Sequence, residues 1–170
     1  MKETRGYSAA AHHEKKGFLI TGGHNRQHLS SCEITKDGVT FEDFTPLPIA
    51  LHHHCAVALN YNDDDGDFFV AGGIPTSNRA FIHKGGQWNE MTRMPTARYG
   101  KKPSLEMENE LICLKHFIAG LMCGPVRASP GGRVEKIVAA GGQDVRQLIN
   151  IVEIYDITGN KWKRGGCIWA

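Results

Sequence analysis

The chain of 170 residues has the composition of one globular domain, because 41% of its residues are hydrophobic and 22% are charged. Its formal net charge is only +2 and the basic residues are scattered, which argues against a nucleic-acid partner. No apolar run approaches the roughly 18 residues of a membrane span, and no apolar segment follows the polar start. We therefore expect a cytoplasmic protein without a membrane or nucleic-acid partner.

The cysteine pattern gives no sign of a disulfide framework or a zinc site. There are five cysteines, an odd number, and no two of them have Cys-x-x-Cys spacing. The expected state is therefore a buried reduced thiol at Cys32, Cys55, Cys113, Cys123 and Cys167.

A short apolar run closed by two glycines occurs three times along the chain. The runs cover residues 18–21, 68–71 and 136–140, and they precede the pairs Gly22-Gly23, Gly72-Gly73 and Gly141-Gly142. Runs of this kind, followed by residues that tolerate positive φ, are typical of a buried strand that turns sharply at its end.

Each run is followed by a polar loop and by a predicted hairpin. The hairpins contain two apolar or aromatic residues seven positions apart around a turn, which are Ile34 and Phe41, Phe81 and Trp88, and Tyr155 and Trp162. Proline-led segments at 48–51 and 95–98 then lead into another extended stretch. Each unit is therefore predicted to contain four strands and to share one hairpin design.

This pattern resembles the kelch repeat, in which an apolar strand ends in Gly-Gly and a Tyr and a Trp follow. The last copy, residues 137–162, is the closest, whereas the first has Ile34 and Phe41 where the family prefers Tyr and Trp. The resemblance implies an all-β, kelch-type β-propeller over 1–170, with about three four-stranded antiparallel blades at about 5–45, 46–92 and 93–166. The residues expected to build the repeat are Gly22, Gly23, Gly72, Gly73, Gly141, Gly142, Phe81, Trp88, Tyr155 and Trp162.

The repeat period is broken between the second and third copies. Gly22 and Gly72 are 50 residues apart, whereas Gly72 and Gly141 are 69 apart, and setting residues 101–120 aside restores an interval of 49. The joined segment, 95–100 with 121–126, then has the pattern of a first strand. Two explanations remain open: a retained intron with splice-like codons at its ends, or a true insertion that forms a short amphipathic helix or an irregular loop.

The loops after the Gly-Gly pairs are the candidate binding site, because the resemblance implies that such loops, with the connections between blades, line one face and contact the partner. Each loop contains one arginine, so we expect a shallow basic surface suited to a protein or an acidic peptide, with ordinary solvated arginines as the alternative. The candidate residues are His24, Asn25, Arg26, His28, Asn78, Arg79, Gln143, Asp144 and Arg146.

Two other polar groups are not expected to bind metal. His52 and His54 would share a face of a strand, but two nitrogens are too few for a site, so a structural or surface role is expected. The acidic run 63–67 lacks the later glutamate of a calcium-binding loop and is interpreted as a solvated turn.

The sequence has no Gly-x-Ser-x-Gly elbow, phosphate-binding glycine loop or His-Glu-x-x-His pattern, so we expect a non-catalytic protein–protein interaction module without a cofactor. For a longer parent protein, the resemblance implies substrate recognition in a ubiquitin-ligase adaptor or a role as a cytoskeletal scaffold. The alternative is a copper oxidase of the galactose oxidase type, which needs a tyrosine, a cysteine and histidines around one ion. Because closed propellers have about four to eight blades, three blades are expected to need further blades from a longer parent chain or another subunit.

Overall fold

The computed structural model describes residues 1–59, 67–76, 78–100, 121–127 and 133–167, and within them the chain forms strands and no helix. The expected insertion at 101–120 lies outside the described residues. No helix among the described residues is long and apolar enough to cross a membrane. The strands are β1 (Ala9–His13), β2 (Gly17–Thr21), β3 (Cys32–Thr35), β4 (Glu42–Phe44), β5 (Cys55–Ala58), β6 (Phe68–Ala71), β7 (Ala80–Lys84), β8 (Gln87–Glu90), β9 (Leu121–Arg127), β10 (Val134–Gly141), β11 (Ile151–Asp156) and β12 (Lys161–Cys167).

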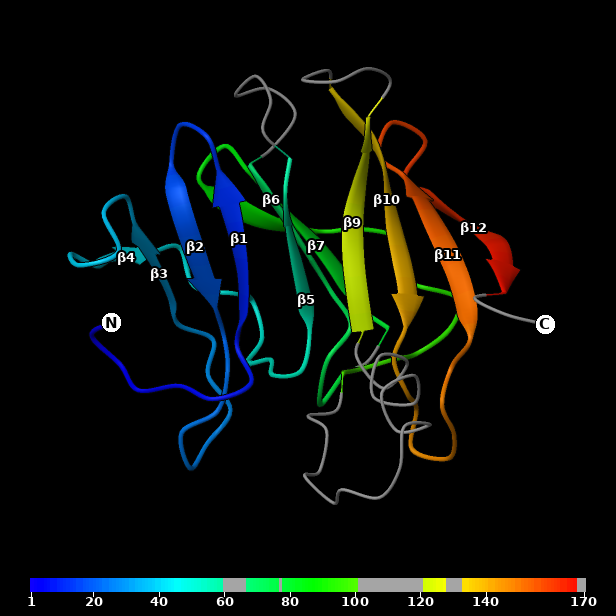
Figure 1. The fold of residues 1–170 in the computed structure, drawn as a ribbon, viewed down its shortest axis with the longest axis horizontal. Helices are drawn as coiled ribbons and strands as arrows, with labels where there is room; N and C mark the ends of the chain where they lie inside the picture. The colour runs from blue at the N-terminus through cyan, green and yellow to red at the C-terminus, as the bar shows by residue number, and fades with distance from the viewer. Residues whose placement is uncertain (60–66, 77, 101–120, 128–132, 168–170) are drawn as a thin grey trace, which may run out of the picture.

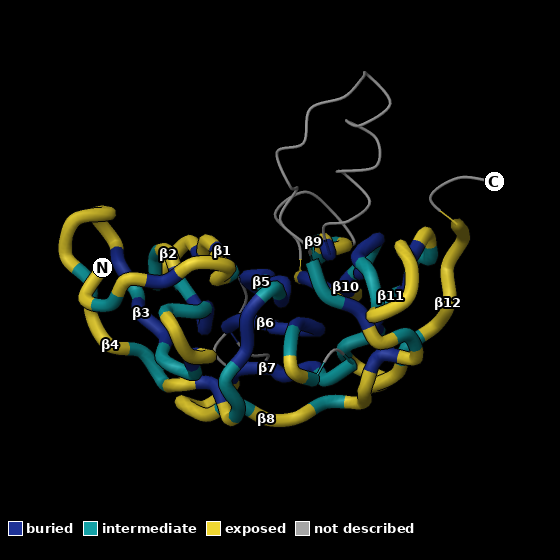
Figure 2. The backbone as a smooth tube through the Cα atoms, turned by 90° about the horizontal axis from the view of Figure 1, so that it is seen from below, coloured by how far each residue is buried: buried dark blue, intermediate teal, exposed yellow. Residues whose placement is uncertain are grey.

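These strands form three four-stranded antiparallel sheets, β1 to β4, β5 to β8 and β9 to β12, each paired in chain order. The inner strand β5 lies beside both β1 and β9, whereas β4, β8 and β12 lie on the outer side of the molecule (Figures 1 and 2). The sheets follow an open arc that does not close into a ring (Figure 2). The prediction of an incomplete all-β propeller with three four-stranded blades is confirmed.

The apolar core lies between successive sheets. Leu19 and Cys32 of the first sheet pack with Phe68, Val70 and Phe81 of the second. On its other side the second sheet packs against the third, through a cluster that includes Phe69, Ala71, Ile82, Ile137, Ala139 and Tyr155. Because the middle sheet is covered on both faces, every residue of β6 is buried and its sequence is a continuous apolar run.

The Gly-Gly pairs are required by the chain that packs against them. Both glycines of each pair have positive φ, for example 73° at Gly72 and 90° at Gly73. A Cβ on Gly72 would collide with the carbonyl oxygen of Arg98 and with the side chain of Leu121, which lead into the next sheet. Glycine therefore allows each strand to turn where the next connection passes.

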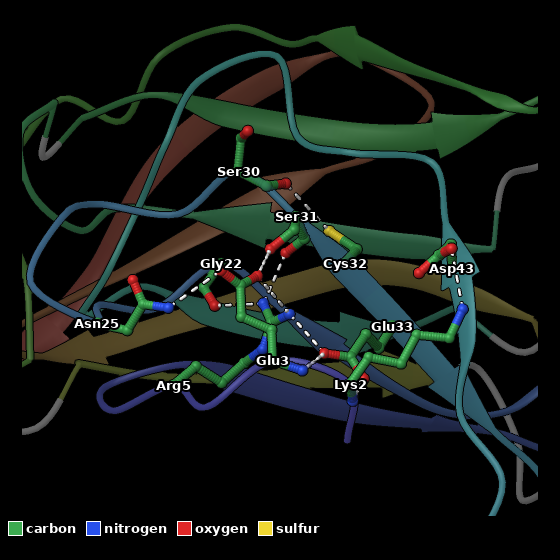
Figure 3. A network of polar contacts seen from close by, with 10 residues as sticks. All are labelled: Lys2, Glu3, Arg5, Gly22, Asn25, Ser30, Ser31, Cys32, Glu33 and Asp43. Carbon is green, nitrogen blue, oxygen red and sulfur yellow. Dashed lines mark hydrogen bonds and ion pairs between the residues drawn. The ribbon is translucent and has the colours of Figure 1, made fainter.

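A buried arginine–glutamate pair anchors the connection before the first sheet (Figure 3). Arg5 lies 2.6 Å from Glu33 of β3, and it also donates to the carbonyl oxygens of Gly22 and Ser31, both at 2.8 Å. Burial alone raises the pKa of Glu33, but the Lys2 amide and the Arg5 guanidinium outweigh it and hold that pKa below its ordinary value.

The third sheet repeats this arrangement. Arg98 lies 2.7 Å from Glu153 of β11 and donates to the carbonyl oxygens of Gly141 and Ile151. In the second sheet both places hold apolar residues. Phe81 of β7 takes the place of the glutamate, since it pairs with Val70 of β6, and Leu51 of the preceding connection takes the place of the arginine.

The prediction of one common hairpin design is wrong. Tyr155 pairs directly with Trp162, whereas Trp88 pairs with His83 and Phe81 pairs with Glu90. The reason is the turn: Gly85 and Gly86 alone join β7 to β8, whereas 157–160 join β11 to β12. Equal spacing in the sequence therefore does not give equal positions in the sheet.

The prediction of reduced thiols is wrong for two cysteines. Cys55 of β5 and Cys123 of β9 form a disulfide with a Cα–Cα distance of 5.8 Å. They are 68 residues apart, and they meet because their strands are neighbours at the inner side of the arc. Cys32 is free and buried as expected, whereas Cys167 is free but exposed, and Cys113 lies outside the described residues.

The interpretation of the acidic run as a solvated turn is wrong for Asp67, and its first residues lie outside the described part of the chain. Asp67 is buried between the first two sheets, where its carboxylate lies 2.6 Å from Lys16 and 2.9 Å from His83. Burial raises the pKa of Asp67, but hydrogen bonds from Lys16 and His83 outweigh it and lower that pKa. This carboxylate therefore ties two blades together.

Candidate binding surface

The loop after each Gly-Gly pair is held against the connection that leads into an inner strand. Isolated antiparallel bridges join Gly6 to His24, His52 to Ile74 and Tyr99 to Gln143. The three connections are also linked to one another, because the His53 amide donates to the Tyr7 carbonyl and the Gly100 amide donates to the His53 carbonyl. Loops from all three blades are therefore held by one continuous backbone network.

Four histidines and a tyrosine gather where the first loop meets the second connection. We call His24, His28, His52, His53 and Tyr7 the histidine cluster. The ring of His52 lies 4.5 Å from that of His28, 4.7 Å from that of His53 and 5.6 Å from that of His24, measured between centroids. Tyr7 stacks on His53 at 4.2 Å. The cluster is a set of packed rings with an exposed edge at His28 and Tyr7.

Unusual backbone geometry coincides with this cluster. Tyr7, Arg26 and His53 have positive φ of 55°, 73° and 58°, a region that residues other than glycine seldom adopt. Such conformations persist only where the surroundings hold them, and they concentrate at functional sites. The backbone at this surface is therefore held in place by its packing.

Burial keeps the inner rings of the cluster neutral. Burial and the neighbouring His53, His28 and His24 lower the pKa of His52 to about 4, and burial with His24 also lowers the pKa of His53. The Nδ1 atoms of His52 and His53 are buried without a hydrogen-bond partner. Because these two atoms are buried, a partner that docks on the surface does not reach them.

His54 lies behind the cluster and has a structural role. Its ring shares a hydrogen bond of 2.7 Å with the Thr21 hydroxyl of β2, and burial lowers its pKa to about 3. His54 therefore joins the first blade to the second.

The three predicted arginines differ in their surroundings. Arg26 and Arg146 are exposed in their loops. Arg79 donates two hydrogen bonds to Glu90, at 2.9 and 2.6 Å, and its guanidinium lies 4.9 Å from the centre of the Phe81 ring. Glu90 thus offsets the charge of Arg79, and a basic surface made by all three arginines stays a prediction.

The other predicted residues serve mainly to shape the loops. The Asn25 amide donates to Glu3, and the carboxylate of Asp144 accepts from the backbone amides of Arg146 and Gln147. The Asn78 carbonyl accepts from the Met94 amide, and Gln143 forms the bridge to Tyr99 already described.

Metal coordination is not built into the cluster as it stands. Among the described residues, no group of three or more His, Cys, Asp or Glu is arranged to hold a metal ion. The imidazoles instead contact one another through their ring faces and edges.

Tyr7, His52 and His53 were not among the residues predicted for the binding surface. Their place could be found by counting back from the inner strands, since Gly6, His52 and Tyr99 form equivalent bridges to the three loops. The expected surface included the connections between blades, but the residues predicted for it all came from the loops.

Comparison with known families finds a match to the Kelch motif at residues 135–167, which extend from β10 to the end of β12. This is the copy with the closest resemblance in sequence. No curated protein matches the chain.

Proposed function

We propose that this chain, an incomplete propeller with a Kelch motif at residues 135–167, acts as a non-catalytic interaction module whose histidine cluster and flanking loops contact a protein partner. Kelch repeats generally mediate protein–protein contacts, which supports the general role. The observation that carries the proposal is the histidine cluster, where packed rings, the exposed residues His28 and Tyr7, and residues with positive φ coincide.

The cluster has the properties of a rigid contact surface. Aromatic and imidazole rings have few rotatable bonds, so they lose little entropy when a partner orders them. His28 and Tyr7 are exposed to solvent, and Arg26 lies in the same loop as His28. We propose an acidic peptide segment as the partner, because a carboxylate can accept hydrogen bonds from both an imidazole and a guanidinium.

Two finer roles are proposals that need separate tests. Substrate recognition in a ubiquitin-ligase adaptor and a cytoskeletal scaffold both use a loop surface of this kind, and we propose them as the two contexts to test. The proposed non-catalytic role can be separated from a copper oxidase by metal analysis of the purified protein, since stoichiometric copper would contradict it.

The test is selection of binders from a random peptide library on the immobilised chain. We expect the selected peptides to be acidic, and we expect Arg26→Ala and His28→Ala to weaken their binding at least about tenfold, which corresponds to about 1.4 kcal/mol. Lys84→Ala is the matched control, because Lys84 is also an exposed cation but lies at the turn between β7 and β8. Peptides that bind all of these variants equally would place the binding surface elsewhere and refute the proposal.

A further inference from the structure

Each contact between two blades uses opposite faces of the two sheets. We call the face that the earlier sheet offers its forward face and the face that the later sheet offers its backward face. The residue three positions before the first glycine of each pair lies on the forward face, and the residues two and four positions before it lie on the backward face.

The forward face of the third sheet is built like the other two but is uncovered. Leu19 and Phe69 occupy the third position before the glycine pair and are 0% exposed, whereas Val138 at the same position is only partly buried. Met122 on this face is 42% exposed. The centre of this face is apolar over β9, β10 and β11, with the paired Lys136 and Asp156 at one end. Its apolar residues are Met122, Val126, Val138, Ala140, Val152 and Ile154.

The backward face of the first sheet is uncovered in the same way. Phe68 and Ile137, four positions before their glycine pairs, are 0% exposed, whereas Phe18 at the matching position is 49% exposed. Ile20 lies beside it and is only partly buried, although Val70 and Ala139 at its matching positions are 0% exposed. The first and third sheets lie at the two ends of the arc (Figure 2). One end thus carries an unused backward face and the other an unused forward face.

We propose that the occupant of each free face is a second copy of this chain, so that two copies close a six-bladed ring. The forward face of the third sheet would pack on the backward face of the partner's first sheet, and the twofold axis would repeat the contact on the other side of the ring. Both faces repeat positions that already form the contacts between blades inside the chain. The number of blades in a closed ring favours two copies over three. Two copies give six blades, within the usual range of about four to eight, whereas three copies give nine.

The disulfide supplies a geometric template for the new contact. Cys55 lies on the forward face of its sheet and pairs with Ala71, whereas Cys123 lies on the backward face of its sheet and pairs with Ala139. Met122 holds in the third sheet the place that Cys55 holds in the second, on the forward face. Ala10, which pairs with Ile20, holds in the first sheet the place that Cys123 holds in the third, on the backward face. Met122 of one copy would therefore lie opposite Ala10 of the other.

The first test is the mass of the purified chain in solution, by light scattering or sedimentation. We expect about twice the chain mass of 18.8 kDa. Phe18→Glu and Val138→Glu should each give a monomer, with Val39→Glu as an exposed control that keeps the dimer. A monomeric native chain would refute the proposal, since other occupants would then have to cover the faces, and polymers larger than a dimer would refute ring closure.

The second test is a designed disulfide, which does not depend on a destabilising substitution. In a background with Cys113→Ser and Cys167→Ser, the pair Ala10→Cys with Met122→Cys should give a covalent dimer under mild oxidation. Ala10→Cys with Val145→Cys is the control, because Val145 is exposed in the loop between β10 and β11. Equal cross-linking of both pairs, or none of the designed pair, would refute the placement of the two faces.

Discussion

At the scale of single residues, two arginine–glutamate pairs hold matching places in the first and third blades, and a leucine with a phenylalanine holds that place in the second. A buried ion pair gains attraction but loses hydration, so an apolar pair of similar volume can replace it with little change in stability. Removing one partner alone is different, because it leaves an unpaired buried charge. This place in the blade therefore accepts either the ion pair or the apolar pair, but not a buried arginine or glutamate without its partner.

We expect Arg98→Met to lower the free energy of unfolding by about 3–5 kcal/mol, since Glu153 would remain buried without its partner. The double variant Arg98→Leu with Glu153→Phe, which copies Leu51 and Phe81, should lose much less. Urea unfolding measures both. If the double variant is as unstable as the sum of its single changes, the second blade is not a valid model for the third.

The buried histidines predict that stability falls on mild acidification. The pKa of His54 is lowered to about 3 and that of His52 to about 4 in the folded chain, whereas the unfolded chain has the ordinary value of 6.5. Between these values the unfolded state binds more protons, so the free energy of unfolding decreases as the pH falls below 6.5. Unfolding at pH 7, 6 and 5 measures this, and His54→Gln should reduce the slope. An unchanged slope in that variant would show that His54 is not responsible.

At the scale of elements, the blades are joined by contacts at their outer and inner strands. The indole of Trp88 in β8 donates to the Thr45 carbonyl at 2.9 Å, and the indole of Trp162 in β12 donates to the Thr92 carbonyl at 2.8 Å. Each of these two outer strands is thus fixed to the connection that precedes its own blade. At the inner side, the disulfide joins β5 to β9.

We expect the pair of substitutions Cys55→Ala and Cys123→Ala to lower the free energy of unfolding by about 2–4 kcal/mol, because the disulfide restricts the unfolded chain over a long loop. Denaturant unfolding measures the change, and Cys167→Ser should have no effect because Cys167 is exposed and free. If the native chain unfolds at the same denaturant concentration with and without a reducing agent, the disulfide does not contribute to stability.

At the scale of the whole molecule, the open arc leaves apolar sheet faces uncovered at its two ends (Figure 2). Uncovered faces of this kind bury apolar area when a second copy associates, so association and stability become linked. Under the proposed association, burial at the ends of the arc therefore adds to the stability that the core between the blades supplies.

If two copies close the ring, the thermal midpoint should rise with protein concentration, because association stabilises the folded state by mass action. Calorimetry over a hundredfold range of concentration measures this. Phe18→Glu should unfold at a lower temperature that does not depend on concentration. A midpoint of the native chain that stays constant would show that unfolding is not coupled to association.

The sequence by itself determined the architecture. Three apolar runs ending in Gly-Gly indicated three blades, because a strand buried on both faces and a turn with positive φ leave few residue choices. The last copy also carried enough of the pattern to match the Kelch motif. These signals are local, so they could be read without the fold.

Only the tertiary structure decided which distant residues meet. The disulfide of Cys55 with Cys123, the burial of Asp67 between Lys16 and His83, and the gathering of Tyr7, His52 and His53 around the first loop all join separate segments of the chain. Such contacts depend on how sheets pack in the arc and on the length of each turn. Neither is encoded in the spacing of a single repeat, which is why the blades could be predicted and the composition of their binding surface could not.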